Sequence, residues 1–214
     1  ADRVNGQAVA KAVASTRFPV DGVINSSSPE IREAIDLARL YSATSVLIVA
    51  GEDSQRTYDE NYRHWREVVR AAVPHAEQHG VRLLVENVRA TFLKTAEGMA
   101  SFLDDCGSPM VGSYFDVGNA ITWTSQAPEH WVRVLGPRIG KLDIKDRGHA
   151  LFGEPKLKSP TAAGTDGGEV HWANVRSELA RLNYTGWATA ELRAGDRRWL
   201  AAVARWMDQV LGRE

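Results

Sequence analysis

The chain has 214 residues, 43% of them hydrophobic, which is enough to bury the core of one domain without disulfide bonds. Its 26 basic and 27 acidic side chains nearly cancel to a formal charge of −1, so the chain has no charged field that would hold nucleic acid or an anionic membrane surface. No apolar run approaches the roughly 20 residues that cross a bilayer, and the first residues lack the apolar stretch of a secretory signal. We therefore expect one cytoplasmic domain over residues 1–214, in which the single cysteine, Cys106, is a buried structural thiol.

Short apolar runs alternate with longer segments of helical period, which is typical of a parallel sheet covered by helices. Ser28 before Pro29 predicts a helix N-cap, and Gly80 predicts a helix end. A stretch over 148–168, rich in Gly, Pro, Ser and Thr, predicts a long loop that is either a functional lid or a disordered insertion. The predicted strands are 20–25, 45–50, 81–86, 110–116, 139–145 and 186–191, and the predicted helices are 6–14, 29–42, 57–79, 95–105, 128–135, 172–182 and 197–211.

Six strands fit two architectures. An open doubly wound sheet accommodates them directly, whereas a closed TIM (β/α) barrel has eight strands in roughly 250 residues and would lack its first two βα units here. In that incomplete barrel, strands 20–25 and 186–191 would each expose an unpaired edge, and such edges promote association, for example into a homo-oligomer. The number of strands alone does not distinguish between the two architectures, and the motifs below favour the barrel.

Four predicted strands carry a carboxylate near their carboxyl ends, where chemistry is located in parallel α/β folds. A buried carboxylate is costly unless it is paired or binds a cation, and a shared divalent metal would offset all four. For any one of them, the alternative is a helix N-cap or a salt bridge. The four residues are Glu86, Asp116, Asp143 and Glu191.

Strand alternation puts Lys141, Asp143 and Lys145 on one face. If Asp143 reaches the metal, Lys145 lies one layer further out, where a substrate oxygen or phosphate would bind. Its positive charge would also offset the excess negative charge of the carboxylates. The alternative for Lys145 is an ordinary ion pair with Asp146.

Three segments resemble the sugar phosphate isomerases and epimerases that have a xylose-isomerase-like TIM barrel. The stretch from the family's fifth to its sixth strand is similar to LLVENVRATFLKTAEGMASFLDDCGSPMVGSYFDVGN. Its sixth helix and seventh strand are similar to APEHWVRVLGPRIGKLDIKD, and its ending is similar to GTDGGEVHWANVRSELARLNYTGWATAEL. The three segments together are specific, whereas any one of them alone would be weak.

The resemblance implies a metal site with two catalytic glutamates. In the family a Glu, an Asp, a His and a Glu hold one divalent metal, and the glutamates also move the proton. Glu86 and Glu191 match the glutamates, and Asp116 matches the aspartate. Asp143 falls on the histidine position, because this chain reads Asp-Ile-Lys-Asp where the family reads His-x-Lys-Asp. Four carboxylates make a hard, all-oxygen set, so we expect Mn²⁺ or Mg²⁺ in preference to Zn²⁺ or Co²⁺.

The reaction implied is isomerisation or epimerisation of a ketose or a sugar phosphate. The metal would stabilise an enediolate, one glutamate would remove a proton, and the other would return it. Candidates for binding the sugar are Lys145, Arg147, Asn119, Asn87 and His171, each with ordinary loop hydrogen bonding as the alternative. Trp123 and Trp172 could cover the apolar face of a sugar, or could simply pack.

Other functions remain open to different degrees. An endonuclease of this barrel type would need more clustered histidines and a basic face, and the six histidines are scattered. An inosose-type dehydratase could use the same metal and the same acid–base pair. The aspartate at position 143 also leaves open a catalytically silent barrel that binds a sugar or only a partner.

Overall fold

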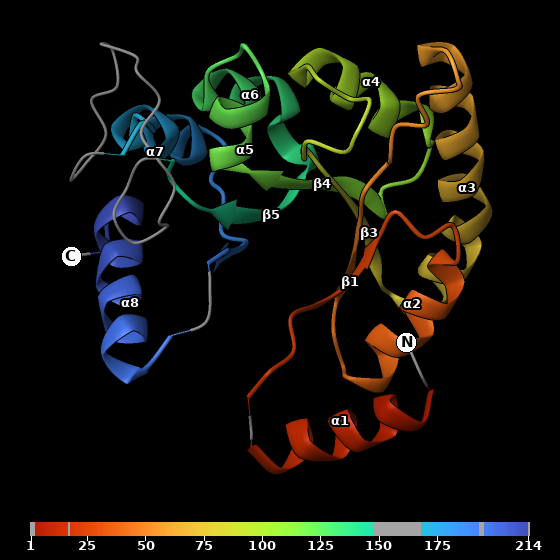
Figure 1. Ribbon diagram of the computed structural model, residues 1–214, viewed down its shortest axis with the longest axis horizontal. Coiled ribbons are helices and arrows are strands. Elements are labelled where there is room, and N and C mark those ends of the chain that lie inside the picture. The colour runs from red at the N-terminus through yellow and green to blue at the C-terminus, as the bar shows by residue number, and fades with distance from the viewer. Residues whose placement is uncertain (1–2, 17, 148–167, 193–194, 214) are drawn as a thin grey trace. The chain divides into compact units, whose positions relative to one another are not determined.

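The computed structural model describes residues 3–16, 18–147, 168–192 and 195–213, and the predicted loop over 148–168 lies almost wholly outside them. Six strands alternate with helices in the order shown in Figure 1. The strands are β1 (Gly22–Ser26), β2 (Ser45–Ile48), β3 (Arg82–Glu86), β4 (Val111–Asp116), β5 (Ile139–Ile144) and β6 (Trp187–Ala190). The helices are α1 (Arg3–Thr16), α2 (Ile31–Leu40), α3 (Tyr58–His79), α4 (Ala96–Asp105), α5 (Val117–Trp123), α6 (Pro128–Leu135), α7 (Trp172–Arg181) and α8 (Arg197–Leu211), with a short 3₁₀ helix over Gly136–Arg138.

The six predicted strands are confirmed, each within two residues of its predicted ends. They follow one another in the sheet in chain order, from β1 to β6, and the paired strands are parallel. The chain divides into two compact units. The first comprises Ala1–Glu86, Ala90–Phe92 and Ser101–Ser113, and the second comprises Asn87–Arg89, Leu93–Ala100 and Tyr114–Glu214. The prediction of one domain over 1–214 stays a prediction.

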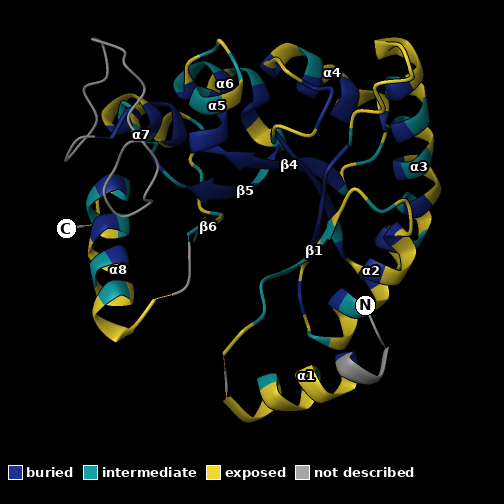
Figure 2. Cartoon of the chain, in the orientation of Figure 1, coloured by how far each residue is buried: buried dark blue, intermediate teal, exposed yellow. Residues whose placement is uncertain are grey.

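The first unit is built on β1, β2 and β3. Val46 of β2 pairs with Val23 on one side and with Leu83 on the other, and every residue of β2 is buried. Every residue of β4 is buried as well, and Figure 2 shows this strand in dark blue. Helix α2 packs on β1 and β2, α3 packs on β3, and the two helices contact each other. A capping box between Thr57 and Glu60 starts α3, and Gly80 ends it at a φ of 64°, as predicted.

The second unit contains the end of β4 together with β5 and β6, which pair in register from Lys141 and Trp187 onward. Trp131 of α6 stacks on Phe115 of β4, and their ring centroids are 5.9 Å apart. Helices α6, α7 and α8 pack in sequence against one another. No helix of the described residues is long and apolar enough to cross a membrane.

The predicted helix N-cap at Ser28 is wrong, and one helix was not predicted. Helix α2 begins at Ile31 rather than at Pro29, because the Ser28 hydroxyl accepts a hydrogen bond from the Glu30 amide in a turn before the helix. Helix α5 was not predicted, since it has only seven residues and follows β4 without a loop.

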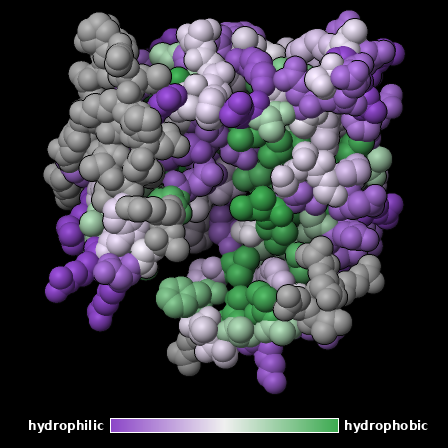
Figure 3. All heavy atoms as spheres, in the orientation of Figure 1, coloured by the Kyte–Doolittle hydropathy of each residue, from purple (hydrophilic) through white to green (hydrophobic). Residues whose placement is uncertain are grey.

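The outer strands of the sheet order carry exposed apolar side chains. Ile24 on β1 and Trp187 on β6 are both exposed, and among the described strands each of these two strands pairs with one neighbour. In Figure 3, hydrophobic atoms of the first unit gather around β1 and toward α1. A cavity of about 510 Å³ lies there, and its lining includes Val23, Ile24 and Leu37. None of the predicted site residues lines this cavity.

Candidate metal and acid–base site

Asp116 is a firmly held carboxylate of the candidate site. It ends β4, is fully buried, and caps α5 by accepting a hydrogen bond from the Asn119 amide at 2.7 Å. The side chain of Asn87 bonds both the amide and the carbonyl of Asp116, each at 2.8 Å. The Asn119 side chain in turn accepts a bond from the Trp123 indole at 3.1 Å. Asn87 and Asn119 thus fix the position of Asp116, and their predicted contact with substrate stays a prediction.

Three of the predicted ligands converge in the second unit. Carboxylate oxygens of Asp116, Asp143 and Glu191 all lie within 4.8 Å of one another. Asp143 is buried on β5 opposite Thr189, and Glu191 directly follows β6, where its amide donates to the Ile144 carbonyl at 3.2 Å. The parallel register of β5 and β6 therefore brings Asp143 and Glu191 to the same end of the sheet.

Lys145 is placed among these carboxylates. Its Nζ lies 2.9 Å from Asp116 Oδ2 and 2.6 Å from Glu191 Oε2. A Cβ at position 118 would clash with Lys145, so Gly118 permits this close approach. The alternative, an ion pair between Lys145 and Asp146, is wrong. The Asp146 carboxylate instead accepts hydrogen bonds from the amides of residues 169 and 170 and from the Trp172 indole.

The pKa values of Asp116, Glu191 and Lys145 are all shifted from their ordinary values. Burial raises the pKa of Asp116 well above its ordinary value, although the Lys145 charge acts in the opposite direction. Burial also acts to raise the pKa of Glu191, but hydrogen bonds with Asp116 and Lys145 outweigh it and leave this pKa below its ordinary value. Burial acts to lower the pKa of Lys145, but the two carboxylates outweigh it and raise this pKa, so the lysine stays protonated. Paired perturbed groups of this kind are frequent at functional sites.

The donor set fits a small, hard divalent ion. Asp116 Oδ2 is buried and, among the described residues, receives no hydrogen bond of good geometry, although Lys145 Nζ lies 2.9 Å from it. An oxygen of this kind is costly in a protein interior unless a cation binds it. Asp143 and Glu191 add carboxylate oxygens near it, which are the ligands that Mn²⁺ and Mg²⁺ prefer.

Glu86 is the last residue of β3 and belongs to the first unit. Its side chain is buried, as expected of a residue at the end of an apolar strand. Its roles as fourth ligand and as acid–base residue stay predictions.

The other predicted substrate-binding residues lie close to the ends of the segment 148–167. Arg147 is half-buried, and its Nε has no hydrogen-bond partner in the described part of the chain. His171 stands at the N-cap position of α7. For both, binding of substrate stays a prediction.

The two tryptophans considered as cover for a sugar, Trp123 and Trp172, differ in burial. Trp172 is buried, donates to Asp146 at 2.9 Å and packs edge-on against Trp206, so the packing alternative is right for it. Trp123 is partly exposed, and the Arg89 guanidinium lies 5.3 Å from its ring centroid.

Asp146 has a structural role that was not predicted from the sequence. Burial raises its pKa to about 6, although the hydrogen bonds that it accepts act to lower it. A Cβ at position 168 would clash with the Asp146 carboxylate, so glycine is required there. The adjoining glycines at 167 and 168 are the sequence signal that could have indicated such a close approach.

Comparisons with known proteins agree with this fold. The family model described as xylose isomerase-like TIM barrel matches residues 25–210. The crystal structure of 3-keto-D-glucoside 4-epimerase, YcjR, from E. coli has a TM-score of 0.72 at 14% identity, over 94% of this chain and 84% of that one. D-psicose 3-epimerase with D-tagatose, from Clostridium cellulolyticum H10, has a TM-score of 0.65 at 17% identity, over 84% of this chain and 68% of that one.

The structure of IOLI protein with a zinc atom bound has a TM-score of 0.72 at 12% identity, over 97% of this chain and 82% of that one. None of the curated proteins matches the chain in sequence. At these identities the solved structures establish the fold alone, and they confirm the TIM-barrel architecture that the motifs favoured over an open doubly wound sheet.

Proposed function

Because the chain belongs to the xylose isomerase-like TIM barrel family, we propose that it is a divalent-metal-dependent isomerase or epimerase of a ketose or a sugar phosphate. The observation that carries this proposal is the convergence of Asp116, Asp143 and Glu191, whose oxygens lie within 4.8 Å of one another at the ends of parallel strands. Glu86, at the end of β3, is proposed as the fourth ligand on the basis of its equivalent strand position and the family resemblance. The similar folds of two sugar epimerases support the substrate class.

An ion held by these carboxylates would act as a Lewis acid that stabilises negative charge on two neighbouring substrate oxygens. We propose that Glu191 is the general base. Its pKa is held below the ordinary value, so it is ionised at neutral pH, and its side chain is 52% exposed and can reach a bound molecule.

Glu86 is proposed to return the proton. Delivery to the opposite face of the same carbon gives an epimer, and delivery to the neighbouring carbon of the enediolate gives an isomer. Lys145, which stays charged beside Glu191, is proposed to bind a substrate oxygen or phosphate. Asn87 is proposed as a positioning residue, since its side chain binds the amide and the carbonyl of Asp116. The backbone amide of Asn119 also binds the Asp116 carboxylate.

The proposal is tested by exchange of substrate hydrogen with solvent. The purified chain, loaded with Mn²⁺ or Mg²⁺, is incubated in deuterated water with a panel of ketoses, ketose phosphates and inososes, and carbon-bound deuterium is followed by NMR. We expect exchange with at least one sugar, and a loss of about 100-fold or more in Glu191→Gln, because a positioned acid or base contributes at least that factor. The matched control is Glu30→Gln, an exposed glutamate before α2, which should exchange at the wild-type rate.

The same spectra separate the possible reactions, since an epimer, an isomer and a dehydrated product differ in their signals. One observation favours a second candidate, a catalytically silent sugar-binding barrel: the Lys145 ammonium already lies 2.6 Å from Glu191 and 2.9 Å from Asp116, where it could take the place of a metal. Absence of bound metal together with absence of exchange on every sugar, in a protein that still binds one of them by calorimetry, would contradict the isomerase and support this candidate.

A further inference from the structure

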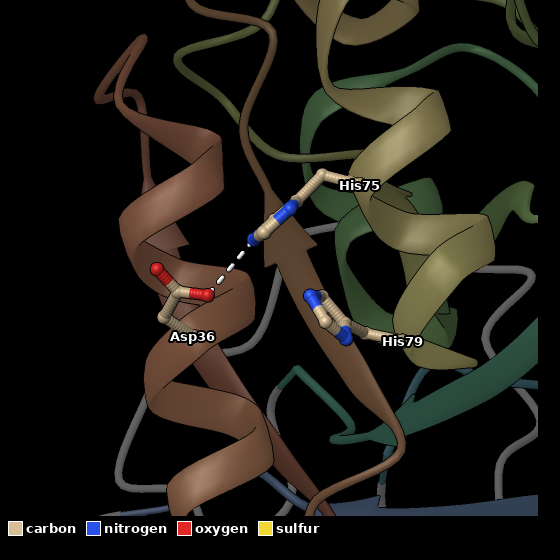
Figure 4. A group of neighbouring side chains, drawn as sticks. All are labelled: Asp36, His75 and His79. Carbon is tan, nitrogen blue, oxygen red and sulfur yellow. Dashed lines mark hydrogen bonds and ion pairs between the residues drawn. The ribbon is translucent and has the colours of Figure 1, made fainter.

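A second group of metal-ligating side chains lies on the helical layer of the first unit. His75 and His79 are one helical turn apart on α3, so they share a face of that helix. Figure 4 shows both rings reaching toward Asp36 on the neighbouring helix α2. His75 Nε2 lies 2.8 Å from Asp36 Oδ1, and the two imidazole centroids are 4.4 Å apart with the rings nearly perpendicular.

We propose that Asp36, His75 and His79 form a binding site for a zinc-like transition-metal ion, in addition to the carboxylate site. One potential ligand atom from each residue lies within 4.8 Å of the other two. Ligand atoms of a tetrahedral zinc ion, bound at about 2.0–2.2 Å, are roughly 3.3 Å apart. The His75 Nε2 and Asp36 Oδ1 atoms, 2.8 Å apart, already lie near that spacing. The fourth position would be left for water.

The surroundings are compatible with an ion that enters from solvent. The His75 side chain is 15% exposed and that of Asp36 is 54% exposed, so the group lies at the surface while one imidazole is largely shielded. The Arg39 guanidinium lies within electrostatic range of His79. The positive charge of Arg39 also opposes any cation here, so the affinity should be lower than that of a fully enclosed zinc site.

The donor atoms determine which ions would bind. Two imidazole nitrogens and one carboxylate oxygen suit Zn²⁺, Co²⁺ or Ni²⁺, and they suit Mg²⁺ poorly. The carboxylate group of Asp116, Asp143 and Glu191 offers oxygens alone and has the opposite preference. An ion at the Asp36 group would also connect α2 to α3, so its binding should stabilise the folded first unit.

The test is a zinc titration of the full chain in excess Mg²⁺, which competes for the oxygen site. The histidines are removed together in His75→Ala/His79→Ala, and the carboxylate is altered in Asp36→Asn. The matched control is His64→Ala, since His64 lies on the same helix and packs against Trp65. We expect the wild type and the His64 variant to bind one more zinc per chain than the double variant, and Asp36→Asn to weaken that zinc by at least about tenfold.

A second measurement on the wild type does not depend on the folding of any variant. Zinc should shift the imidazole NMR signals of His75 and His79, leave those of His64 unchanged, and raise the melting temperature. Equal zinc stoichiometry in the wild type and in a folded double variant would overturn the proposal. Unchanged His75 and His79 signals at saturating zinc would overturn it as well, whatever the carboxylate site or the isomerase activity does.

Discussion

Replacing Lys145 with methionine tests the charge balance of the carboxylate cluster. The change keeps the apolar stem and removes the ammonium that lies 2.9 Å from Asp116 Oδ2 and 2.6 Å from Glu191 Oε2. Asp116 is 0% exposed and Lys145 is 22% exposed, so their contact is a buried ion pair, whereas Glu191 is 52% exposed and its contact is largely screened.

Breaking a buried pair costs about 3–5 kcal/mol, and an exposed one about 0–1 kcal/mol. Because Asp116 can take up a proton once its counter-ion is gone, we expect the lower end, a fall of about 3 kcal/mol in the free energy of unfolding. Urea denaturation of the chelator-treated protein, followed by far-UV circular dichroism, measures this loss. Addition of Mn²⁺ should then stabilise the variant more than the wild type, because the ion can take over the charge compensation.

The matched control is Lys11→Met, which removes an exposed lysine of α1 and should change the free energy of unfolding by less than about 0.5 kcal/mol. If Lys145→Met lost no more stability than Lys11→Met, Asp116 would not depend on Lys145 and the account of the cluster would be refuted. A large loss that Mn²⁺ does not reduce would refute the idea that the ion and the ammonium compensate the same carboxylates.

Three further predictions concern single side chains. Asp143→His should shift metal preference toward Zn²⁺ and Co²⁺ over Mn²⁺ in competitive metal analysis, since it replaces an oxygen donor by imidazole. An unchanged preference would exclude Asp143 from the ligand set. Burial raises the pKa of Asp146 to about 6, above its unfolded value near 4. Protonation of Asp146 therefore contributes most to the free energy of unfolding below pH ~4, and this contribution, about 3 kcal/mol, is lost as the pH rises through 6. Asp146→Asn should flatten that part of the stability–pH curve measured by urea denaturation, and a slope equal to wild type would contradict the assignment. Burial raises the pKa of Cys106 to about 12, so a thiol reagent at pH 8 should label it only in urea, and rapid labelling of the folded chain would show the thiol to be accessible.

The sequence was informative about the sheet because each buried strand is a short apolar run, and because acids end several of these runs. Asp116 and Asp143 could be expected at one edge of the sheet from that pattern alone, since parallel strands end together. The partner of Lys145 could not be predicted this way. Its choice between the adjacent Asp146 and the distant Asp116 depends on the close approach at Gly118 and on the amides of 169 and 170, which occupy Asp146.

Two other features, helix α5 and the group of Asp36, His75 and His79, cannot be predicted from hydrophobic periodicity. Helix α5 is too short to show a helical repeat, and it is stabilised by Asp116 acting as its cap. The spacing of His75 and His79 is readable in the sequence, but Asp36 joins them only through the packing of α2 on α3. Contacts between elements far apart in the chain are therefore where sequence patterns were least informative.

The anchoring of Asp146 bears on how this protein could change over evolution. Its carboxylate binds the amides of residues 169 and 170, and so joins the two sides of the segment 148–167 directly. The chain entering and leaving that segment is thus held by β5 and α7, irrespective of what lies between them. Because the entropy of closing a loop grows only with the logarithm of its length, by about 0.6 kcal/mol per doubling, insertions there should cost little stability. Insertions at this position should consequently leave the strands that carry the carboxylates folded.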